Sequence, residues 1–183
     1  MKYAGKISIL LIILMTATML IACGQDKNEN AADNGSETVG SANPFAEYDS
    51  LKEAEDAAGF SFTQPTAPAN YENLVYRAAT DGSMIEVIFY NDDKSEEAFR
   101  TRKGPGDADI SGDYNEYSDE VTEKAGDIDV IMQTDNDGNV YVAKWYNNDY
   151  AYAIDIPQDG SLKLSKDTVL HYVSEIMGTE HRK

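Results

Sequence analysis

The residues best suited to chemistry lie in one acidic loop and in the run just before it. Arg100 and Arg102 alternate in a run that we expect to be extended, so both side chains fall on one strand face. Asp107, Asp109 and Asp113 follow in the loop 104–113. The guanidinium groups could bind a carboxylate or a phosphate, and the carboxylates could bind a hard cation. We favour the competing interpretation, in which the aspartates fold back and neutralise the arginines, or both sets stay solvated at about 0.2–1 kcal/mol per exposed pair.

A second candidate site consists of three tyrosines around one predicted turn, Tyr146, Tyr150 and Tyr152. The chain contains 12 tyrosines and one tryptophan, and aromatic-rich sheets can bind glycans or peptides by stacking. Tyrosine is also favoured in half-buried strands. Packing in the core and between strands is therefore the favoured interpretation, and an aromatic contact surface is the alternative to test.

The segment 135–138, Asp-Asn-Asp-Gly, is similar to part of a calcium-binding loop. If Gly138 takes the sixth position of such a loop, Gln133 takes the first position and Lys144 takes the twelfth. Those positions need an aspartate and a bidentate glutamate. We expect a plain hairpin turn instead, because Asn, Asp and Gly tolerate positive φ.

Nucleophilic catalysis has little support. Ser111 lacks the glycine two residues upstream that a nucleophile elbow requires. The candidate bases are His181, near the C-terminus, and His171, which lies one helical turn before Glu175 on an expected solvent face. We therefore expect a protein that is not an enzyme, with no catalytic residues, no metal site and no cofactor. Paired-carboxylate chemistry stays open because acidic residues are abundant.

The composition restricts the classes of partner. The 183 residues include 33 acidic and 15 basic side chains, which gives a net charge of −18. A nucleic-acid partner is excluded, because neutralising phosphates needs clustered Lys and Arg. One cysteine and two histidines are too few for a disulfide framework or a structural zinc site.

The N-terminal residues 1–22 have the pattern of a secretory signal peptide. Two lysines precede an apolar run that ends at Ala22, directly before Cys23. The apolar run of 16 residues would span about 24 Å as a helix, against roughly 30 Å of hydrocarbon in a bilayer. The small residue before a lone cysteine resembles the lipobox of bacterial lipoproteins, which implies a diacylglyceryl group on the Cys23 sulfur. Two acyl chains would anchor the protein to a membrane that the chain does not span.

The rest of the chain divides into a linker and one domain. Residues 23–43 comprise the lipidated cysteine and an acidic, polar segment that buries too little apolar surface to fold, so we expect a flexible linker. Residues 44–183 have the length of a single domain. That domain is expected to be extracytoplasmic.

The elements of this domain follow from capping and hydrophobic patterns. Ser50 and Gly59 delimit a first helix, and Ser165 and Gly178 delimit a last one. Residues 60–69, with two prolines, should be an extended connection. Strand patterns occur at 74–79, 84–90, 98–103, 128–134, 139–146 and 150–156. Short connections require antiparallel pairing. We predict an α+β fold: a curved antiparallel sheet of about six or seven strands, with an N-terminal and a C-terminal helix packed on one face.

Five segments together resemble a domain-of-unknown-function family found in Gram-positive surface lipoproteins, some of whose relatives form the extracytoplasmic part of anti-sigma factors. They are Asn43-Pro44-Phe45, Glu53-Ala54 with Gly59-Phe60, Ile85-Glu86-Val87-Ile88, the stretch Arg102-Lys103-Gly104-Pro105-Gly106-Asp107 running into Asp109-Ile110-Ser111-Gly112-Asp113-Tyr114, and Lys144-Trp145 before Tyr150-Ala151-Tyr152. The resemblance covers most of residues 43–178. It implies location and fold. It implies no reaction and no catalytic residues.

These observations predict a membrane-anchored lipoprotein at the outer face of the cytoplasmic membrane of a Gram-positive cell. The favoured function is a non-catalytic, monomeric binding or sensing module for an unidentified small molecule, glycan or protein. The first alternative is an envelope hydrolase that uses carboxylates of the loop 107–113, with or without a divalent cation. A regulator that binds a partner protein is the second alternative. It has less support, because we expect no cytoplasmic domain before the signal segment.

Overall fold

The computed structural model describes residues 43–178 of the chain. The predicted signal peptide, Cys23, most of the predicted linker and His181 lie outside the described residues. The expectations for those segments therefore remain predictions.

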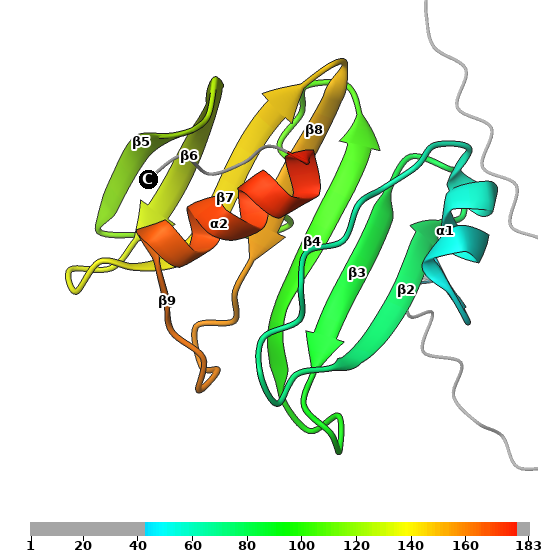
Figure 1. Cartoon of the computed structure of the whole chain (residues 1–183), viewed down its shortest axis with the longest axis horizontal. Coiled ribbons are helices and arrows are strands. Elements are labelled where there is room, and N and C mark those ends of the chain that lie inside the picture. The colour runs from blue at the N-terminus through cyan, green and yellow to red at the C-terminus, as the bar shows by residue number, and fades with distance from the viewer. Residues whose placement is uncertain (1–42, 179–183) are drawn as a thin grey trace, which may run out of the picture. The chain divides into compact units, whose positions relative to one another are not determined.

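The described residues form one antiparallel sheet flanked by two helices (Figure 1). The strands are β1 (Phe45–Tyr48), β2 (Asn73–Ala79), β3 (Ile85–Tyr90), β4 (Glu97–Pro105), β5 (Asp119–Ala125), β6 (Ile128–Thr134), β7 (Asn139–Asn147), β8 (Tyr150–Asp155) and β9 (Leu164–Ser165). Their order is β1-β2-β3-β4-β8-β7-β6-β5, and the short β9 pairs with β7. The sheet thus consists of two four-stranded meanders that join where β4 pairs with β8.

Both helices begin and end where their capping residues predict. Helix α1 (Leu51–Ala58) begins after Ser50, whose Oγ accepts from the backbone N–H of Glu53 at 3.3 Å. Helix α2 (Lys166–Met177) begins after Ser165 in the same way. Gly59 and Gly178 close the helices in the left-handed conformation, with φ of 82° and 62°, which glycine adopts without steric cost. The predictions for both helices are confirmed.

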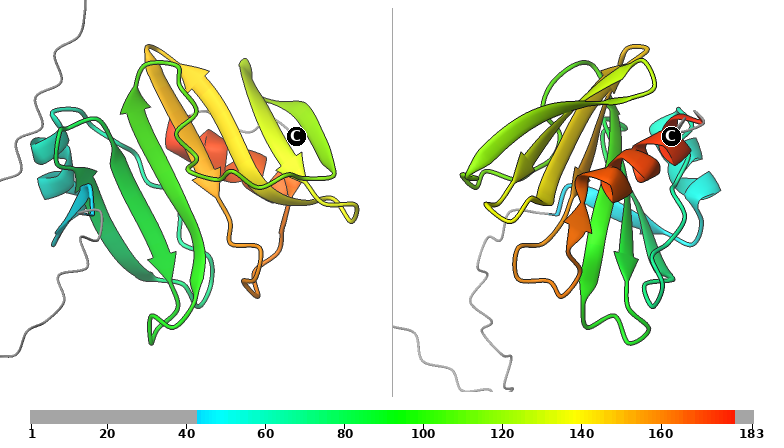
Figure 2. Two further views of the ribbon diagram at one scale, coloured as in Figure 1. Left: turned by 180° about the vertical axis from the view of Figure 1, so that it is seen from behind. Right: turned by 60° about the vertical axis from the view of Figure 1, so that its left-hand side comes forward.

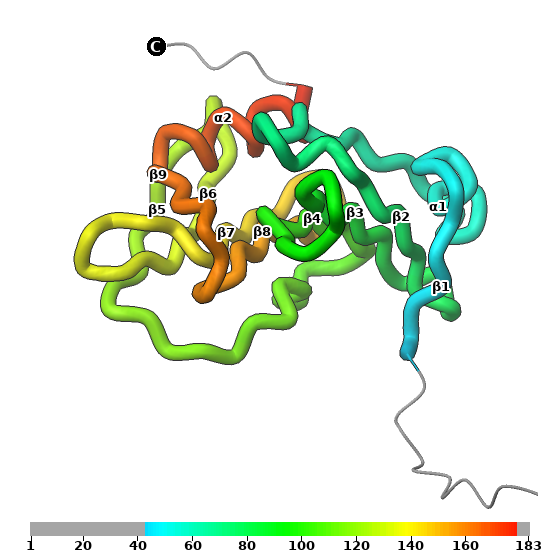
Figure 3. The backbone as a smooth tube through the Cα atoms, turned by 90° about the horizontal axis from the view of Figure 1, so that it is seen from below, coloured from blue at the N-terminus to red at the C-terminus, as the bar shows by residue number. Residues whose placement is uncertain are grey.

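The apolar core lies between the helices and one face of the sheet (Figures 2 and 3). Phe99 of β4 stacks on Phe89 of β3 and on Tyr172 of α2, with ring centroids 4.6 and 5.1 Å apart. Leu51 and Ala58 of α1 pack against the same cluster. The two helices therefore cover one face, as predicted.

The extended connection between α1 and β2 also lies on the helical side. The backbone N–H and hydroxyl of Thr66 both donate to the carboxylate of Glu175 in α2, at 3.0 and 2.7 Å. Residues 60–69 contain no helix or strand, as expected from Pro65 and Pro68. The connection thereby links the N-terminal part of the domain to its last helix.

On the opposite face, the loop between β4 and β5, residues 106–118, crosses β8, β7 and β6 (Figure 2, left). The loop carries most of the predicted ligand patch. One layer of the domain is therefore helical and apolar, and the other consists of this loop packed over charged strand residues.

The predicted fold class is confirmed, but the sheet has more strands than expected. The strands β1, β5 and β9 were not predicted. Strand β1 has four residues and β9 has two, so neither shows a strand period. Strand β5 is an edge strand in which only Ala125 is buried, so its sequence lacks the usual alternation of apolar residues.

Candidate functional site

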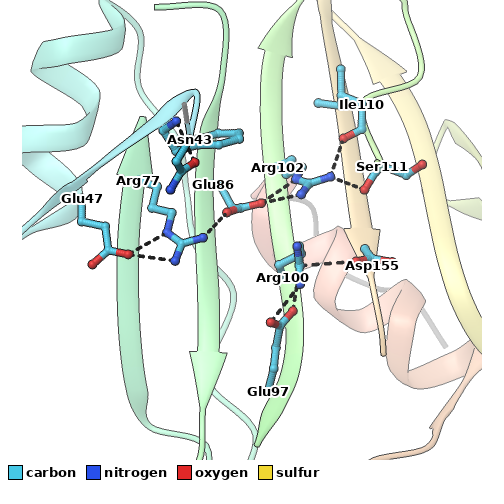
Figure 4. Close-up of polar contacts among 11 residues, drawn as sticks. Asn43, Glu47, Arg77, Glu86, Glu97, Arg100, Arg102, Ile110, Ser111 and Asp155 are labelled. Atoms are coloured by element: carbon cyan, nitrogen blue, oxygen red, sulfur yellow. Dashed lines mark hydrogen bonds and ion pairs between the residues drawn. The ribbon is translucent and has the colours of Figure 1, made fainter. Parts of the chain in front are cut away.

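A buried ion pair lies at the centre of the loop-covered face. Glu86 alternates along β3 with Ile85 and Val87, so its side chain points away from the helices. Its carboxylate is 1% exposed, and Oε2 lies 2.7 Å from Nε and 2.6 Å from Nη2 of Arg102 on β4 (Figure 4). Arg77 of β2 places Nη1 3.4 Å from Oε1 of the same carboxylate. The strand register brings these charges together, because Glu86 is the direct partner of both arginines.

Arg102 also fastens the loop to the sheet. Its Nη1 donates to the carbonyl oxygen of Ile110 at 3.1 Å and to that of Ser111. Gly112 follows with φ of +70°, and a Cβ there would collide with the same guanidinium. Every nitrogen of Arg102 is thus engaged inside the protein. Its role is to hold the loop.

Arg100 occupies the same strand face but is partly accessible. Its Nε and Nη2 donate to the Glu97 carboxylate at 2.7 and 2.9 Å, and its Nε lies 3.3 Å from Oδ2 of Asp155 on β8. Burial disfavours the charged guanidinium, but Glu97, Glu86 and Asp155 together outweigh this effect and raise the pKa of Arg100. Burial raises the pKa of Asp155 to about 6, although Arg100 and Arg102 oppose the shift.

The loop aspartate Asp109 bonds to its own loop and to β7. Its Oδ1 accepts from the backbone N–H and hydroxyl of Ser111 at 2.8 and 2.7 Å, and its Oδ2 lies 2.9 Å from Nζ of Lys144. Burial would raise the pKa of Asp109, but these bonds outweigh it and lower the pKa. Asp109 is therefore a charged group that attaches the loop to β7.

The other two loop aspartates differ in their surroundings. Asp113 accepts from the backbone N–H of Asn115 at 2.6 Å and from the hydroxyl of Tyr117. Burial and this bond to Asp113 raise the pKa of Tyr117 to about 12. Asp107 is exposed, and within residues 43–178 it has no ion-pair partner within 4 Å.

The predicted patch therefore does not form one site. Arg100 and Arg102 share a strand face, as predicted, but Glu86, Glu97 and Asp155 neutralise them, rather than the loop aspartates. The remaining members of the patch line two separate hollows, one on each side of the loop. Ligand binding by either group stays a prediction.

The first hollow, which we call the Asp155 hollow, has a volume of about 540 Å³. It lies between the loop and the segment after β8. Arg100, Asp113, Tyr114, Asp155 and Gln158 are among its lining residues. Arg100 and Asp155 pair with each other there, and Asp113 bonds within the loop to Asn115 and Tyr117. The side chain of Tyr114 is 96% exposed.

The second hollow, which we call the Tyr146 hollow, has a volume of about 530 Å³. It lies where the loop, the β5–β6 turn and the ends of β6, β7 and β8 meet. Its lining includes Asp107, Asp109, Asp127, Asp129, Ile131 and Tyr146. Ile131 is 38% exposed and Tyr146 is 49% exposed. Both are unusually accessible for large apolar side chains of the described chain, so this hollow combines open apolar surface with carboxylates.

The structure separates the three predicted aromatic residues. Tyr146 points to the loop-covered face, and its hydroxyl bonds to Asp149 at 3.2 Å. Tyr152 lies in the core with 8% of its surface exposed, and its ring stacks on that of Trp145 with centroids 5.3 Å apart. Tyr150 lies beneath Lys103, whose Nζ is 4.1 Å from the ring centroid. Two of the three thus serve packing, as favoured, and Tyr146 alone presents an open ring.

The other sequence candidates occupy structural positions. Ser111 is 2% exposed and donates to Asp109. The side chain of His171 is 60% exposed, and its Nε2 lies 3.7 Å from Oε1 of Glu175. The segment 135–138 is a turn in which Asp135 accepts from two backbone N–H groups, so the expectation of a plain turn is confirmed. Residues 43–178 contain no group of three or more His, Cys, Asp or Glu placed to hold a metal ion.

No family model, curated protein or solved structure matches this chain. No helix within residues 43–178 is both long and apolar enough to cross a membrane.

Sequence reasoning missed several residues of these sites, among them Glu86, Ile131, Asp155 and the two aspartates Asp127 and Asp129. Glu86 is the lone acid in an apolar central strand, and a buried acid needs a partner on a neighbouring strand, so its position was a usable signal. Ile131 alternates with the buried residues Val130 and Met132, which places it on the other face. Asp155 at the end of β8 gave no comparable signal.

Proposed function

We propose that this protein is a membrane-anchored bacterial lipoprotein whose domain is a non-catalytic extracytoplasmic binding or sensing module. The location rests on the signal-like segment 1–22 and on the lipobox-like position of Cys23. The binding role rests on one observation, the Tyr146 hollow. Its volume of about 530 Å³ falls within the 300–1,000 Å³ of typical small-molecule sites.

The distribution of hydrogen bonds favours binding over hydrolysis. A carboxylate pair that hydrolyses a glycosidic bond needs one proton-donating acid and one free carboxylate facing the substrate. The enzyme hypothesis would use carboxylates of the loop 107–113, and two of its three aspartates, Asp109 and Asp113, are bonded within the domain. Within residues 43–178, Asp107 alone of the three is exposed without an ion pair, so the loop offers one free carboxylate and no second acid placed opposite it. In the Tyr146 hollow, by contrast, the open ring of Tyr146 and the side chain of Ile131 are free to contact a ligand.

The location is tested by expressing the full chain in a Gram-positive host. Mass spectrometry should show a mature N-terminal Cys23 that carries a diacylglyceryl group. The Cys23→Ala variant should be released from the membrane fraction or missorted. A cleaved, soluble product with an unmodified Cys23 would disprove the anchor.

The binding role is tested with the full chain in a panel of small molecules, glycans and peptides. A ligand should raise the thermal unfolding midpoint in the unaltered protein, and the Tyr146→Ala variant should weaken that effect. Turnover assays on the same panel provide the opposing test. A hydrolytic rate that depends on a divalent cation and is abolished in a folded Asp109→Ala variant would replace this proposal with the enzyme.

A further inference from the structure

The Tyr146 hollow combines two kinds of surface, an exposed apolar part and a charged part. The apolar part consists of the side chain of Ile131 on β6 and the ring of Tyr146 on β7, which are 38% and 49% exposed. The register pairs Ile131 with Lys144, two residues before Tyr146, so the two apolar side chains lie close together on the same sheet face. They form an apolar floor open to solvent.

The charged part surrounds this floor with four aspartates. Asp107 and Asp109 come from the loop, and Asp127 and Asp129 come from the β5–β6 turn and the start of β6. The lining contains one basic residue, Lys144. The rim therefore has a formal excess of negative charge.

Two of these carboxylates have partners, and two do not. Asp109 pairs with Lys144 at 2.9 Å, and Asp129 pairs with Lys124 at 2.7 Å. Asp107 and Asp127 have no ion pair within 4 Å in the described part of the chain. Lys144 therefore does not compensate them, because its charge is already matched by Asp109.

We propose that the Tyr146 hollow binds a small organic cation, in which one ammonium or guanidinium group is attached to an apolar body of about dipeptide size. This inference rests on the proposed binding function and names its ligand class. The cation lies between Asp107 and Asp127, and the apolar body covers Ile131. The Tyr146 ring contributes through its negative face, which attracts cations. An anionic ligand is excluded by the rim charge, and a fully hydrophilic cation would leave the floor exposed.

The only tryptophan of the chain, Trp145, belongs to the lining of this hollow and provides the readout. The full chain in non-ionic detergent is titrated with acetyl-Leu-Arg-amide, and Trp145 fluorescence is followed. Acetyl-Leu-Gln-amide and acetyl-Leu-Glu-amide are the neutral and acidic controls, and cyclohexylethylamine tests whether the peptide bond is needed. Saturable binding of the arginine peptide below about 10 mM, with weaker binding of both controls, is expected. Binding should also weaken at high salt, because the Debye length falls to about 3 Å at 1 M.

Two double variants and one single variant test whether the ligand binds in this hollow. Asp107→Asn with Asp127→Asn should weaken binding roughly tenfold, since each carboxylate contributes nearly 1 kcal/mol at about 5 Å in water. Asp92→Asn with Asp119→Asn removes the same charge from exposed positions at the opposite end of the strands, and should change binding less than twofold. For the ring, Tyr146→Ala should weaken binding severalfold.

The inference would be overturned by equal binding of the arginine and glutamine peptides, by no saturable response to either cation, or by unchanged binding in the Asp107/Asp127 variant. Equal binding of the neutral peptide would still leave a binding module. Failure of every ligand in the wider panel would overturn the proposed binding function as well. If cyclohexylethylamine binds as tightly as the peptide, the charge and apolar body are sufficient, which supports the inference.

Discussion

The buried pair between Arg102 and Glu86 allows one prediction to be worked through from distances. In an Arg102→Met variant, the Glu86 carboxylate would keep only Arg77, with Nη1 3.4 Å from Oε1. Glu86 is 1% exposed, so water cannot replace the two lost contacts of 2.6 and 2.7 Å. The carbonyl groups of Ile110 and Ser111 would lose their donor as well.

The expected loss is large for a domain of this size. Removing one partner of a buried ion pair costs about 3–5 kcal/mol, because the other charge is left without compensation. The whole free energy of unfolding of a typical domain is about 5–15 kcal/mol. We therefore expect the thermal unfolding midpoint of the Arg102→Met variant to fall by about 10–20 °C. Below that midpoint the variant should still adopt the native fold.

Urea unfolding, followed by Trp145 fluorescence and circular dichroism, measures this loss. Glu47→Gln is the control for an exposed pair: its partner Arg77 is held at 2.8 Å, but Glu47 is 60% exposed, so the loss should stay below about 1 kcal/mol. A Glu86→Leu, Arg102→Met double variant should recover the part of the loss that comes from the unpaired Glu86 carboxylate. It should not recover the part that comes from the carbonyl groups of Ile110 and Ser111, which still lack their donor. A loss below about 1 kcal/mol in Arg102→Met, or a double variant as unstable as the single one, would refute the reasoning.

Three further substitutions test the same face and its neighbours. The folded-state pKa of Asp155, about 6, lies above its ordinary value of 3.8, so its contribution to stability is present at low pH and is lost as the pH rises through 6. Asp155→Asn should therefore be more stable than the unaltered protein near pH 7.5, by up to about 2–3 kcal/mol, and should lose that advantage near pH 4 in urea unfolding. Gly112→Ala should lose about 1–3 kcal/mol in thermal unfolding through its positive φ and its collision with Arg102, and more than Gly126→Ala, whose φ is +64° in open space. Lys103→Met should lose about 1–2 kcal/mol in urea unfolding, because Nζ donates to a backbone oxygen at 2.7 Å and lies over aromatic rings.

Each of these expectations has an opposing result. A stability difference for Asp155→Asn that is the same at both pH values would show that the carboxylate titrates normally. Equal losses of unfolding free energy in Gly112→Ala and Gly126→Ala would show that the loop backbone shifts to avoid the collision with Arg102. An unchanged midpoint in Lys103→Met would show that the ammonium group contributes nothing to packing.

Local signals predicted much of this fold. Ser50 and Gly59 place α1, and Ser165 and Gly178 place α2, because each signal acts within a few residues. Strand β1 has no such signal. Its partner β2 follows only after α1 and the extended connection, and the pairing of Phe45 with Ala79 depends on the tertiary fold. Strand β5 is stabilised by pairing with β6 along its length, although its own residues are mostly exposed.

The charged face shows the limit of sequence reasoning more clearly. Period-2 geometry correctly placed Arg100 and Arg102 on one strand face. Their partners depend on register, which includes an irregularity between Phe89 and Tyr90 that no composition rule predicts. The contact between Asp155 and Arg100 could not be predicted either, because it exists only where β8 pairs with β4.

The join between β4 and β8 has a consequence for how this chain folds. Strands within each meander follow one another in sequence, whereas β4 and β8 are separated by three whole strands. Loop closure makes such a pairing slow, so we expect the two half-sheets to form first and to meet last. Until they meet, each half exposes an unpaired inner strand, and such edges pair readily with other chains. If the proposed lipid anchor holds neighbouring copies at one membrane surface, this interval would determine how much of the chain folds before its edges pair with another copy.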